Sequence, residues 1–241
     1  MTTLHVVCPV YHEQDNIPAL WREIELHFRF PFVVHFVYDS EDDPTVPVLR
    51  AIQQRNLGQV DLVRNTSRGA LNALKTGLAQ MPPHVPVLVM MADLSDDLAV
   101  TGSMVAAWSG GAAVVVASRY MAGGRQIGGP LLKRWLSMMA GKSLYWLRRL
   151  PVHDATNNFR LYDSDFLRSV SIQSRMGFEL ALELTVKARR AGLPIAELPA
   201  TWRDRTAGSS RFRLLKWLPE YLRWYGYAFL PRHRPKQSAP R

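Results

Sequence analysis

The chain has 241 residues, of which 47% are hydrophobic and 21% charged, a composition that suits one large globular domain. Its single cysteine, Cys8, excludes an internal disulfide framework and fits a reducing compartment, and we expect it to be a small core residue. The amino terminus lacks the segments of a secretory signal, and no run of about 18 apolar residues predicts a membrane-spanning helix. We therefore expect a cytoplasmic protein.

Short apolar runs alternate with amphipathic stretches through the first half of the chain. The apolar runs predict strands at residues 4–10, 32–38, 59–63, 85–91 and 112–117. The amphipathic stretches predict helices between these strands, at residues 16–28, 46–54, 69–80 and 100–108. Alternation of this kind predicts an α/β fold with a mostly parallel sheet and helices on both faces.

The fourth predicted strand ends in a cluster of acidic residues. Asp93 follows the strand, and Asp96 and Asp97 come just after it. Ligands bind beyond the carboxyl ends of parallel strands, and Mg²⁺ and Mn²⁺ prefer hard oxygen ligands, so Asp93 is a candidate metal ligand. Asp96 and Asp97 have a simpler interpretation, in which they start and cap the next helix.

Polar side chains also follow other predicted strands. Tyr11 and Glu13 follow the first strand, Asp39 follows the second, and Arg119 comes after the fifth. The ends of parallel strands meet at one edge of a sheet, where carboxylates and an arginine suit a nucleotide diphosphate held through a metal ion. The first strand is not followed by the glycine pattern of a dinucleotide site, and the chain has no P-loop.

Two later segments mix basic and apolar side chains. Residues 131–150 predict a basic amphipathic helix, which suits either a bilayer surface with a lipid phosphate or a core helix with a solvated basic face. Residues 203–241 contain ten Lys and Arg but only two Asp and Glu, and so carry +8 of the net charge of +10. Interleaved Trp and Tyr favour an anionic membrane surface over a helix docked on the core, and we do not expect nucleic acid as a partner.

Residues 6–17 have the sequence Val-Val-Cys-Pro-Val-Tyr-His-Glu-Gln-Asp-Asn-Ile, which resembles the opening of family 2 inverting glycosyltransferases. The resemblance continues through residues 68–70, 91–97, 117–120, 156–162 and 202–210, and spans about residues 4–225. The last two stretches are similar to the polyprenyl-phosphate (dolichyl-phosphate) mannosyl- and glucosyltransferase branch. The resemblance implies a GT-A type, Rossmann-like fold, and inverting transfer of a hexose from a nucleotide sugar to a polyprenyl phosphate.

The resemblance also implies roles for individual residues by position. The residues implied to bind the nucleotide sugar are Pro9, Tyr11, Glu13, Asp39 and Asp93. The implied catalytic group consists of Asp93, which would also hold a divalent cation (Mg²⁺ or Mn²⁺), with Arg119 and Arg205. The residues implied to bind the acceptor phosphate are Lys133, Arg134, Ser137, Arg205 and Ser210.

Met91 departs from this pattern, because it stands where the family has the first acid of an Asp-x-Asp motif. Loss of one carboxylate should weaken a cation site. Asp96, Asp97 or Glu41 would substitute for it, or arginines would neutralise the diphosphate without a tight metal. The remaining alternative is a non-catalytic, membrane-associated binding subunit.

The identity of the acceptor decides whether a general base is needed. A lipid phosphate is already an anionic nucleophile, whereas a hydroxyl on a glycolipid or polysaccharide precursor needs a carboxylate base, for which Asp154 and Glu179 are candidates. We expect a catalytic domain at residues 1–211, amphipathic membrane-interface helices at 212–230 and a flexible basic tail at 231–241. Such a protein would bind the inner face of the membrane peripherally, with an integral-membrane partner or a second copy of itself for firmer anchoring.

Overall fold

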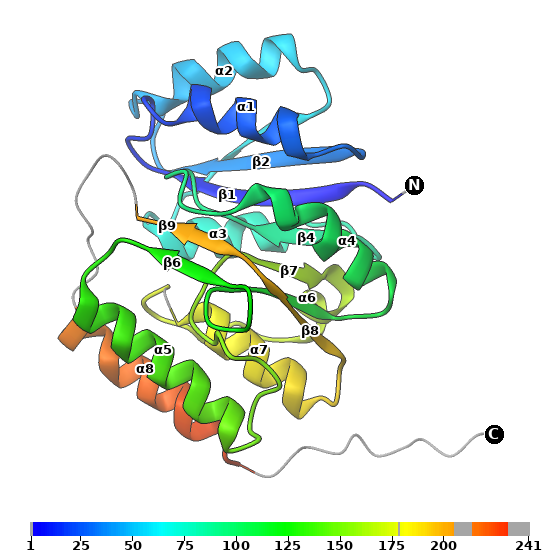
Figure 1. Cartoon of the computed structure of the whole chain (residues 1–241). Coiled ribbons are helices and arrows are strands. Elements are labelled where there is room, and N and C mark those ends of the chain that lie inside the picture. The colour runs from blue at the N-terminus through cyan, green and yellow to red at the C-terminus, as the bar shows by residue number, and fades with distance from the viewer. Residues whose placement is uncertain (1, 178, 205–213, 231–241) are drawn as a thin grey trace.

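A computed structural model of the chain describes residues 2–177, 179–204 and 214–230 (Figure 1). Within these residues the main sheet has seven strands in the order β3-β2-β1-β4-β7-β5-β8, and a second sheet pairs β6 with β9. The strands are β1 (Leu4–Val10), β2 (Phe32–Tyr38), β3 (Val60–Arg64), β4 (Pro86–Val89), β5 (Val114–Ser118), β6 (Arg125–Ile127), β7 (Arg160–Asp163), β8 (Ile195–Pro199) and β9 (Thr201–Arg203). The predicted α/β fold with a mostly parallel sheet is confirmed.

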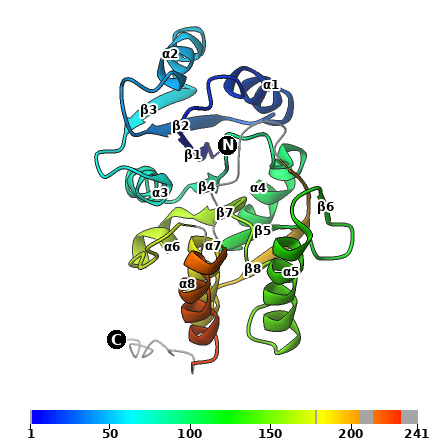
Figure 2. The same ribbon diagram turned by 90° about the vertical axis from the view of Figure 1, so that its left-hand side faces the viewer.

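Helices cover both faces of the main sheet, as predicted. Figure 2 shows α1 and α4 on one side of the sheet and α3 and α6 on the other. The helices are α1 (Ile17–His27), α2 (Thr45–Arg55), α3 (Ala70–Ala79), α4 (Thr101–Ser109), α5 (Leu131–Trp146), α6 (Ser164–Ser169), α7 (Leu180–Arg190) and α8 (Leu214–Tyr227), with a short 3₁₀ turn, η1 (Leu98–Val100), before α4. Helix α5 ends four residues before the predicted boundary, and Arg148 then adopts a left-handed φ of 56°.

The parallel strands place their carboxyl ends at a common edge of the sheet. Val10 of β1 pairs with Tyr38 of β2, so the loops that begin at Tyr11 and Asp39 start side by side. Strand β4 lies parallel on the other side of β1, with Val7 opposite Val89. The loop that carries Asp93 therefore begins at the same edge.

Strand β7 is antiparallel and lies between β4 and β5, an arrangement that the pattern of apolar runs did not predict. Arg160, the first residue of β7, pairs with Val89 at the end of β4 and with Val116 in β5. Because β7 runs in the opposite direction, the loop that leads into it arrives where β4 and β5 leave the sheet. Residues 152–159 thereby reach the same edge as Asp93 and Arg119.

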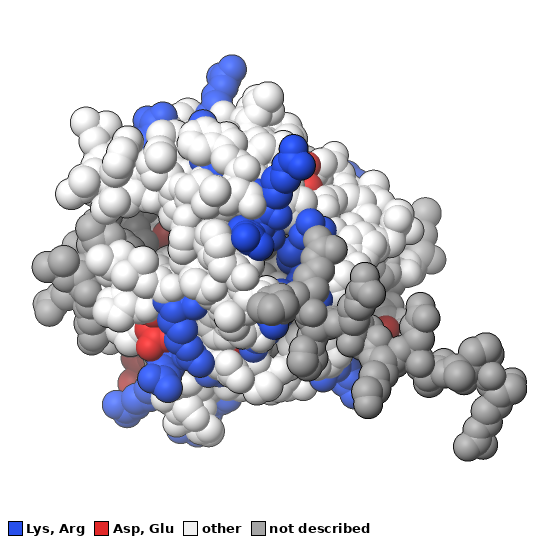
Figure 3. Space-filling view, turned by 90° about the horizontal axis from the view of Figure 1, so that it is seen from below, with Lys and Arg blue, Asp and Glu red and all other residues white. Residues whose placement is uncertain are grey.

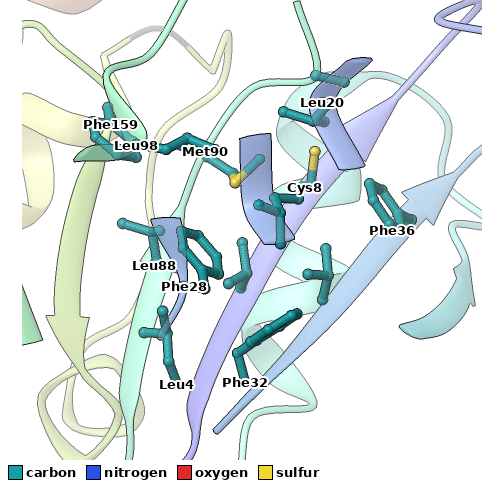
Figure 4. Close-up of a cluster of buried hydrophobic side chains, with 14 of the residues drawn as sticks. Leu4, Cys8, Leu20, Phe28, Phe32, Phe36, Leu88, Met90, Leu98 and Phe159 are labelled. Carbon is teal, nitrogen blue, oxygen red and sulfur yellow. The ribbon is translucent and has the colours of Figure 1, made fainter. Parts of the chain in front are cut away.

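Two buried apolar clusters, one on each face, hold the sheet to its helices. Figure 4 shows part of the first, in which Cys8, Phe36 and Met90 from neighbouring strands contact side chains such as Leu20 of α1. Cys8 is fully buried, which confirms the predicted core role, and burial raises the pKa of its thiol. The second cluster packs side chains of α3, α6 and α7 against the opposite face.

Helix α8 belongs to this second cluster through Trp224, which is buried. Tyr225 of α8 shares a hydrogen bond of 2.9 Å with Ser143 of α5. The residues described here include no helix that is both long enough and apolar enough to cross a membrane. The domain division at residue 211 stays a prediction, and residues 231–241 lie outside the described residues.

Candidate active site

The loop after β1 is held in place by side chains from the loop after β2. The amide of His12 donates to Asp43 Oδ2 at 3.0 Å, and the amide of Glu13 donates to Thr45 Oγ1 at 2.8 Å. The Glu13 carboxylate accepts from Asn16 Nδ2 at 2.6 Å. Burial raises the pKa of Asp43, but its hydrogen bonds to Thr45 and His12 outweigh burial and lower it, so Asp43 is a stable anionic acceptor.

The predicted nucleotide-binding residues of β1 and β2 lie around this loop. Pro9 is buried within β1, and Tyr11 is exposed directly after it. Asp39 accepts hydrogen bonds of 2.7 Å from Asn65 Nδ2 and from the amide of Gly69. Gly69 has a φ of 90°, which glycine adopts readily, and it directly precedes α3. Asp39 therefore connects the end of β2 to the start of α3, at the same edge as Tyr11.

The acidic loop after β4 is organised by hydrogen bonds to its own backbone. Asp93 Oδ1 accepts from Ser95, from the hydroxyl at 2.6 Å and from the amide at 3.2 Å. Asp96 Oδ2 accepts from the amide of Met91 at 3.0 Å, and Asp97 Oδ2 accepts from the amide of Thr201 in β9. Asp97 stands at the predicted N-cap position of η1, whereas Asp96 bonds the amide of Met91 instead of capping the helix. Asp97 precedes η1 but makes no side-chain cap, because its carboxylate instead bonds β9.

Asp93 and Asp96 form a pair of carboxylates whose charges repel each other. Burial, and then the charge of Asp93, raise the pKa of Asp96 to about 7. The described part of the chain contains no group of three or more His, Cys, Asp or Glu that would hold a metal alone. Mg²⁺ is commonly held by one or two carboxylates together with substrate phosphates, and this pair fits such a shared ion.

Arg119, which follows β5, is almost entirely buried and forms a bidentate ion pair with Asp154. Its Nε donates to Asp154 Oδ2 at 2.7 Å, and its Nη2 donates to Asp154 Oδ1 at 3.0 Å. The backbone amide of Arg119 also donates to Asp154 Oδ2. Burial would raise the pKa of Asp154, but Arg119 outweighs burial and lowers it to about 2. Asp154 is therefore ionised at neutral pH and is a weak base.

Ser137, on α5, joins this ion pair, so the structure brings together two residues that were predicted to bind phosphates. Arg119 Nη2 donates to Ser137 Oγ at 3.2 Å and to Thr156 Oγ1 at 2.8 Å. The Tyr120 hydroxyl lies 3.0 Å from Ser137 Oγ and 2.8 Å from Gln126 Oε1 of β6. We call Arg119, Ser137, Asp154 and Thr156 the arginine cluster.

Helix α5 approaches the loop before β7 closely because residue 141 is a glycine. A Cβ atom at Gly141 would lie 2.1 Å from the carbonyl oxygen of His153, which a larger residue would have to displace. Arg160 is also fully buried, and it donates to the carbonyl oxygens of Asp154, Asn157 and Ala181. Arg160 is therefore a structural residue that ties this loop to α7.

Other predicted residues are only partly described. Arg134 is exposed on the first turn of α5. The Lys133 side chain, Arg205 and Ser210 lie outside the described residues. Of the two candidate bases, Asp154 is paired with Arg119, and Glu179 is fully buried, with Oε1 accepting from the amides of Arg175 and Met176.

A pocket of about 430 Å³ adjoins the acidic loop on the side of α1. Met91, Asp96 and Arg203 are among its lining residues, but Asp39 and Arg119 are not. The pocket therefore takes its walls from the acidic loop and α1, and not from the loops of Asp39 and Arg119. Met91, which replaces the expected acid, lies in its wall.

Four residues of the site, Asp43, Tyr120, Gln126 and Thr156, were not predicted from the sequence. Asp43 had a local signal, because Asp-Pro-Thr is a common way to start a helix after a strand. Tyr120 and Thr156 lie within stretches that resemble the family, but their bonds to Ser137 and Arg119 join separate segments of the chain. Gln126, which bonds Tyr120, had no local signal.

Curated relatives match most of this chain at low identity. The polyprenol monophosphomannose synthase of Mycolicibacterium smegmatis is 26% identical over 215 residues, which cover 86% of this chain and 79% of that protein. The dolichol-phosphate mannosyltransferase of Pyrococcus furiosus is 24% identical over 232 residues, or 92% of this chain. The match spans 64% of the Pyrococcus protein, less than two thirds of its length.

Solved structures share the fold. Glucosyl-3-phosphoglycerate synthase from Mycobacterium tuberculosis, in complex with Mn²⁺, UDP and glucosyl-3-phosphoglycerate, aligns with a TM-score of 0.63 and 20% identity over 92% of this chain and 76% of that one. S. aureus TarS 1-349 aligns with a TM-score of 0.65 and 17% identity over 98% of this chain and 67% of that one. These likenesses confirm the expected GT-A type fold. The model of glycosyl transferase family 2 matches residues 5–171, and the chain belongs to this family.

Proposed function

We propose that this glycosyltransferase moves a hexose from a nucleotide sugar to the phosphate of a polyprenyl-phosphate lipid, with inversion at the anomeric carbon. One observation carries the proposal. The arginine cluster, which offers guanidinium and hydroxyl donors to a phosphate, includes Ser137 of α5, just beyond the exposed apolar first turns of that helix. The names of the Mycolicibacterium and Pyrococcus relatives, which refer to polyprenol and dolichol phosphates, support the same acceptor.

The donor would bind at the edge formed by β1, β2 and β4. Pro9, Tyr11, Glu13 and Asp39 would contact the base and ribose, and Asp93 would lie beside the diphosphate. A divalent cation held there by Asp93, with Asp96 next to it, would neutralise charge on the leaving diphosphate. The pair offers few protein ligands, so we expect weak binding of the cation in the absence of the donor.

The acceptor would bind at the arginine cluster. Arg119 and Ser137 would hold its phosphate, with Arg134 and, outside the described residues, Lys133, Arg205 and Ser210. A phosphate oxygen would attack the anomeric carbon from the face opposite the diphosphate, forming one C–O bond as the other breaks. The electron pair of the broken bond leaves with the nucleoside diphosphate, so the protein has only to align the reactants and stabilise charge.

The state of Asp154 favours a phosphate over a hydroxyl acceptor. A hydroxyl must lose its proton, and a carboxylate whose pKa is about 2 and which is paired with Arg119 accepts protons poorly. Glu179 supports the hydroxyl alternative, because its Oε2 atom is buried and no described residue bonds it. A glycolipid or polysaccharide hydroxyl is therefore the second candidate acceptor.

The exposed side chains of α5 and α8 support binding to a membrane surface. Leu131, Leu132 and Trp135 on the first turns of α5 are 79%, 64% and 55% exposed. Leu222 of α8 is also exposed, and so is the neighbouring Arg223. Figure 3 shows Lys and Arg side chains, with few acidic ones, on the underside of the molecule where α5 and α8 lie. We propose that the protein lies peripherally on the inner face of the membrane, alone or with an integral-membrane partner or a second copy.

Transfer to a defined lipid tests the proposal. The purified chain is incubated with radiolabelled GDP-mannose or UDP-glucose and undecaprenyl phosphate in anionic vesicles, with and without Mn²⁺. We expect label in a lipid-linked hexose phosphate from one donor, and none with undecaprenol, which lacks the phosphate. Label in undecaprenol would instead support the hydroxyl acceptor. If calorimetry shows a donor that binds but no acceptor is labelled, the chain is the non-catalytic subunit that Met91 suggested.

A further inference from the structure

The ion pair leaves one edge of the Arg119 guanidinium open. Nε and Nη2 are taken by Asp154, Ser137 and Thr156, whereas Nη1 has no hydrogen-bond partner in the described parts of the chain. The Arg119 side chain is only 10% exposed, so few groups other than a bound ligand reach it. Nη1 carries two N–H groups, and a phosphate oxygen is the acceptor that such a charged donor binds most strongly.

Asp154 is fixed from several directions and cannot turn away from Arg119. Its amide donates to Glu197 Oε1 at 3.1 Å, and its carbonyl oxygen accepts from Arg160 Nη2 at 2.6 Å. Its Oδ1 also accepts from the amides of Thr156 and Asn157. The carboxylate is thus part of a rigid loop. Because two hydrogen bonds join it to Arg119, the orientation of the guanidinium plane is fixed as well.

We propose that Asp154 is a positioning residue, which fixes the Nε and Nη2 edge of Arg119 so that Nη1 is presented to a phosphate oxygen of a bound substrate. The inference rests on the proposed function, in which Arg119 binds phosphate, and adds the residue that orients it. The phosphate oxygen belongs to the lipid acceptor or to the diphosphate of the donor. Ser137 on α5 lies within the same cluster, which favours the acceptor.

Binding of two simple probes tests this orientation without turnover. Farnesyl phosphate represents the acceptor phosphate and inorganic pyrophosphate represents the diphosphate, and both are titrated into the full chain by calorimetry. In Asp154→Asn the carboxylate charge is lost, and we expect the Kd of one probe to rise about tenfold because the guanidinium is free to rotate. The probe that is affected identifies the substrate whose phosphate Nη1 binds.

A second variant and a double variant separate positioning from simple stability. Arg119→Lys keeps a charge for Asp154 but has no second donor edge, so it should weaken the same probe about as much. If Asp154 acts through Arg119, adding Asp154→Asn to Arg119→Lys should cause no further weakening. If Asp154→Asn does not fold, Arg119→Lys still tests whether Arg119 binds a substrate phosphate. Unchanged binding of both probes by that variant would overturn the proposal.

Asp163→Asn is the matched control. Asp163 is a carboxylate at the other end of β7, where it accepts from the indole of Trp108 and caps α6. Its loss should lower the unfolding midpoint but leave the Kd of both probes unchanged. If Asp154→Asn behaves in the same way, Asp154 is only structural and the inference is wrong. If wild-type protein binds the probes but transfers no hexose, the proposed function fails while the orientation of Arg119 is still measured.

Discussion

The two sides of the candidate site, which we propose to bind the donor and the acceptor, are held together by different kinds of bonds. On the donor side, the carboxylates of Asp39, Asp93 and Asp96 accept from backbone amides. On the acceptor side, Arg119 bonds side chains that lie 18 and 37 residues away in the sequence. Asp93 and Asp96 therefore shape their own loop and Asp39 fixes the start of α3, whereas the acceptor cluster joins β5, α5 and the loop before β7 through side-chain bonds. Changes on the acceptor side should cost both stability and activity, and changes on the donor side mainly activity.

Arg160→Met should break the acceptor side most severely. Arg160 is buried, and its loss leaves the carbonyl oxygens of Asp154, Asn157 and Ala181 without this donor. We expect the free energy of unfolding to fall by about 4 kcal/mol. Urea denaturation measures it, with Arg50→Met as control, because the exposed pair of Arg50 and Glu41 should be worth no more than about 0.5 kcal/mol.

Asp93→Asn, on the donor side, should lower activity with little loss of stability. The asparagine side chain can still accept from Ser95, so the loop should keep its shape, but the carboxylate charge for a shared cation is lost. We expect kcat/KM to fall about 100-fold, or about 2.7 kcal/mol, with little change in the unfolding midpoint. Steady-state transfer assays check this, and near wild-type turnover would remove Asp93 from the catalytic group.

The acceptor side should also lose stability in strong acid. The pKa of Asp154 is about 2 in the folded protein, below its ordinary 3.8, so its contribution to stability is present at higher pH and is lost as the pH falls through 2. That contribution is about 2 kcal/mol at neutral pH. The difference in unfolding free energy between wild type and Asp154→Asn should therefore shrink between about pH 5 and about pH 2. A constant difference would contradict the ion pair.

Ser137→Ala should give the smallest effect. It removes a hydroxyl that bonds Arg119 and Tyr120, and should cost about 1 kcal/mol of stability and raise the acceptor KM several-fold, an effect of about 1 kcal/mol. Ser143→Ala lies on the same helix and removes the bond to Tyr225, so it should cost similar stability without changing KM. Equal KM values in the two variants would show that Ser137 does not contact the acceptor.

Much of the first half of the chain, on the proposed donor side, could be predicted because its signals are local. Strands 4–10 and 32–38 are found at the predicted bounds, since each is a short apolar run between polar segments. The positions of Asp39 and Asp93 at the edge of the sheet could be predicted for the same reason, because each comes just after its predicted strand, and their proposed roles in binding stay predictions. An acidic residue just after an apolar run is enough to predict that its side chain lies at the edge of the sheet.

The acceptor half depended on contacts that no local pattern contains. Strand β7 has four residues and pairs with β4 and β5, which lie far earlier in the chain. Asp154 was considered as a base because its partner was unknown, and only the fold shows that Arg119 takes both of its oxygens. Arg160 lies in the stretch 156–162 that resembles the family, yet its donors are used on carbonyl groups inside the protein.

The place of β7 in the sheet has a consequence for synthesis on the ribosome. Strand β4 ends at Val89, but its neighbour on one side begins at Arg160. While the intervening residues are translated, the edge of β4 has no partner, and such an unpaired apolar edge favours association with other chains. A fragment that stops before β7 would retain this open edge permanently. The half of the chain before β7 should therefore be unable to fold as an independent soluble piece, because the second half supplies the strand that completes its sheet.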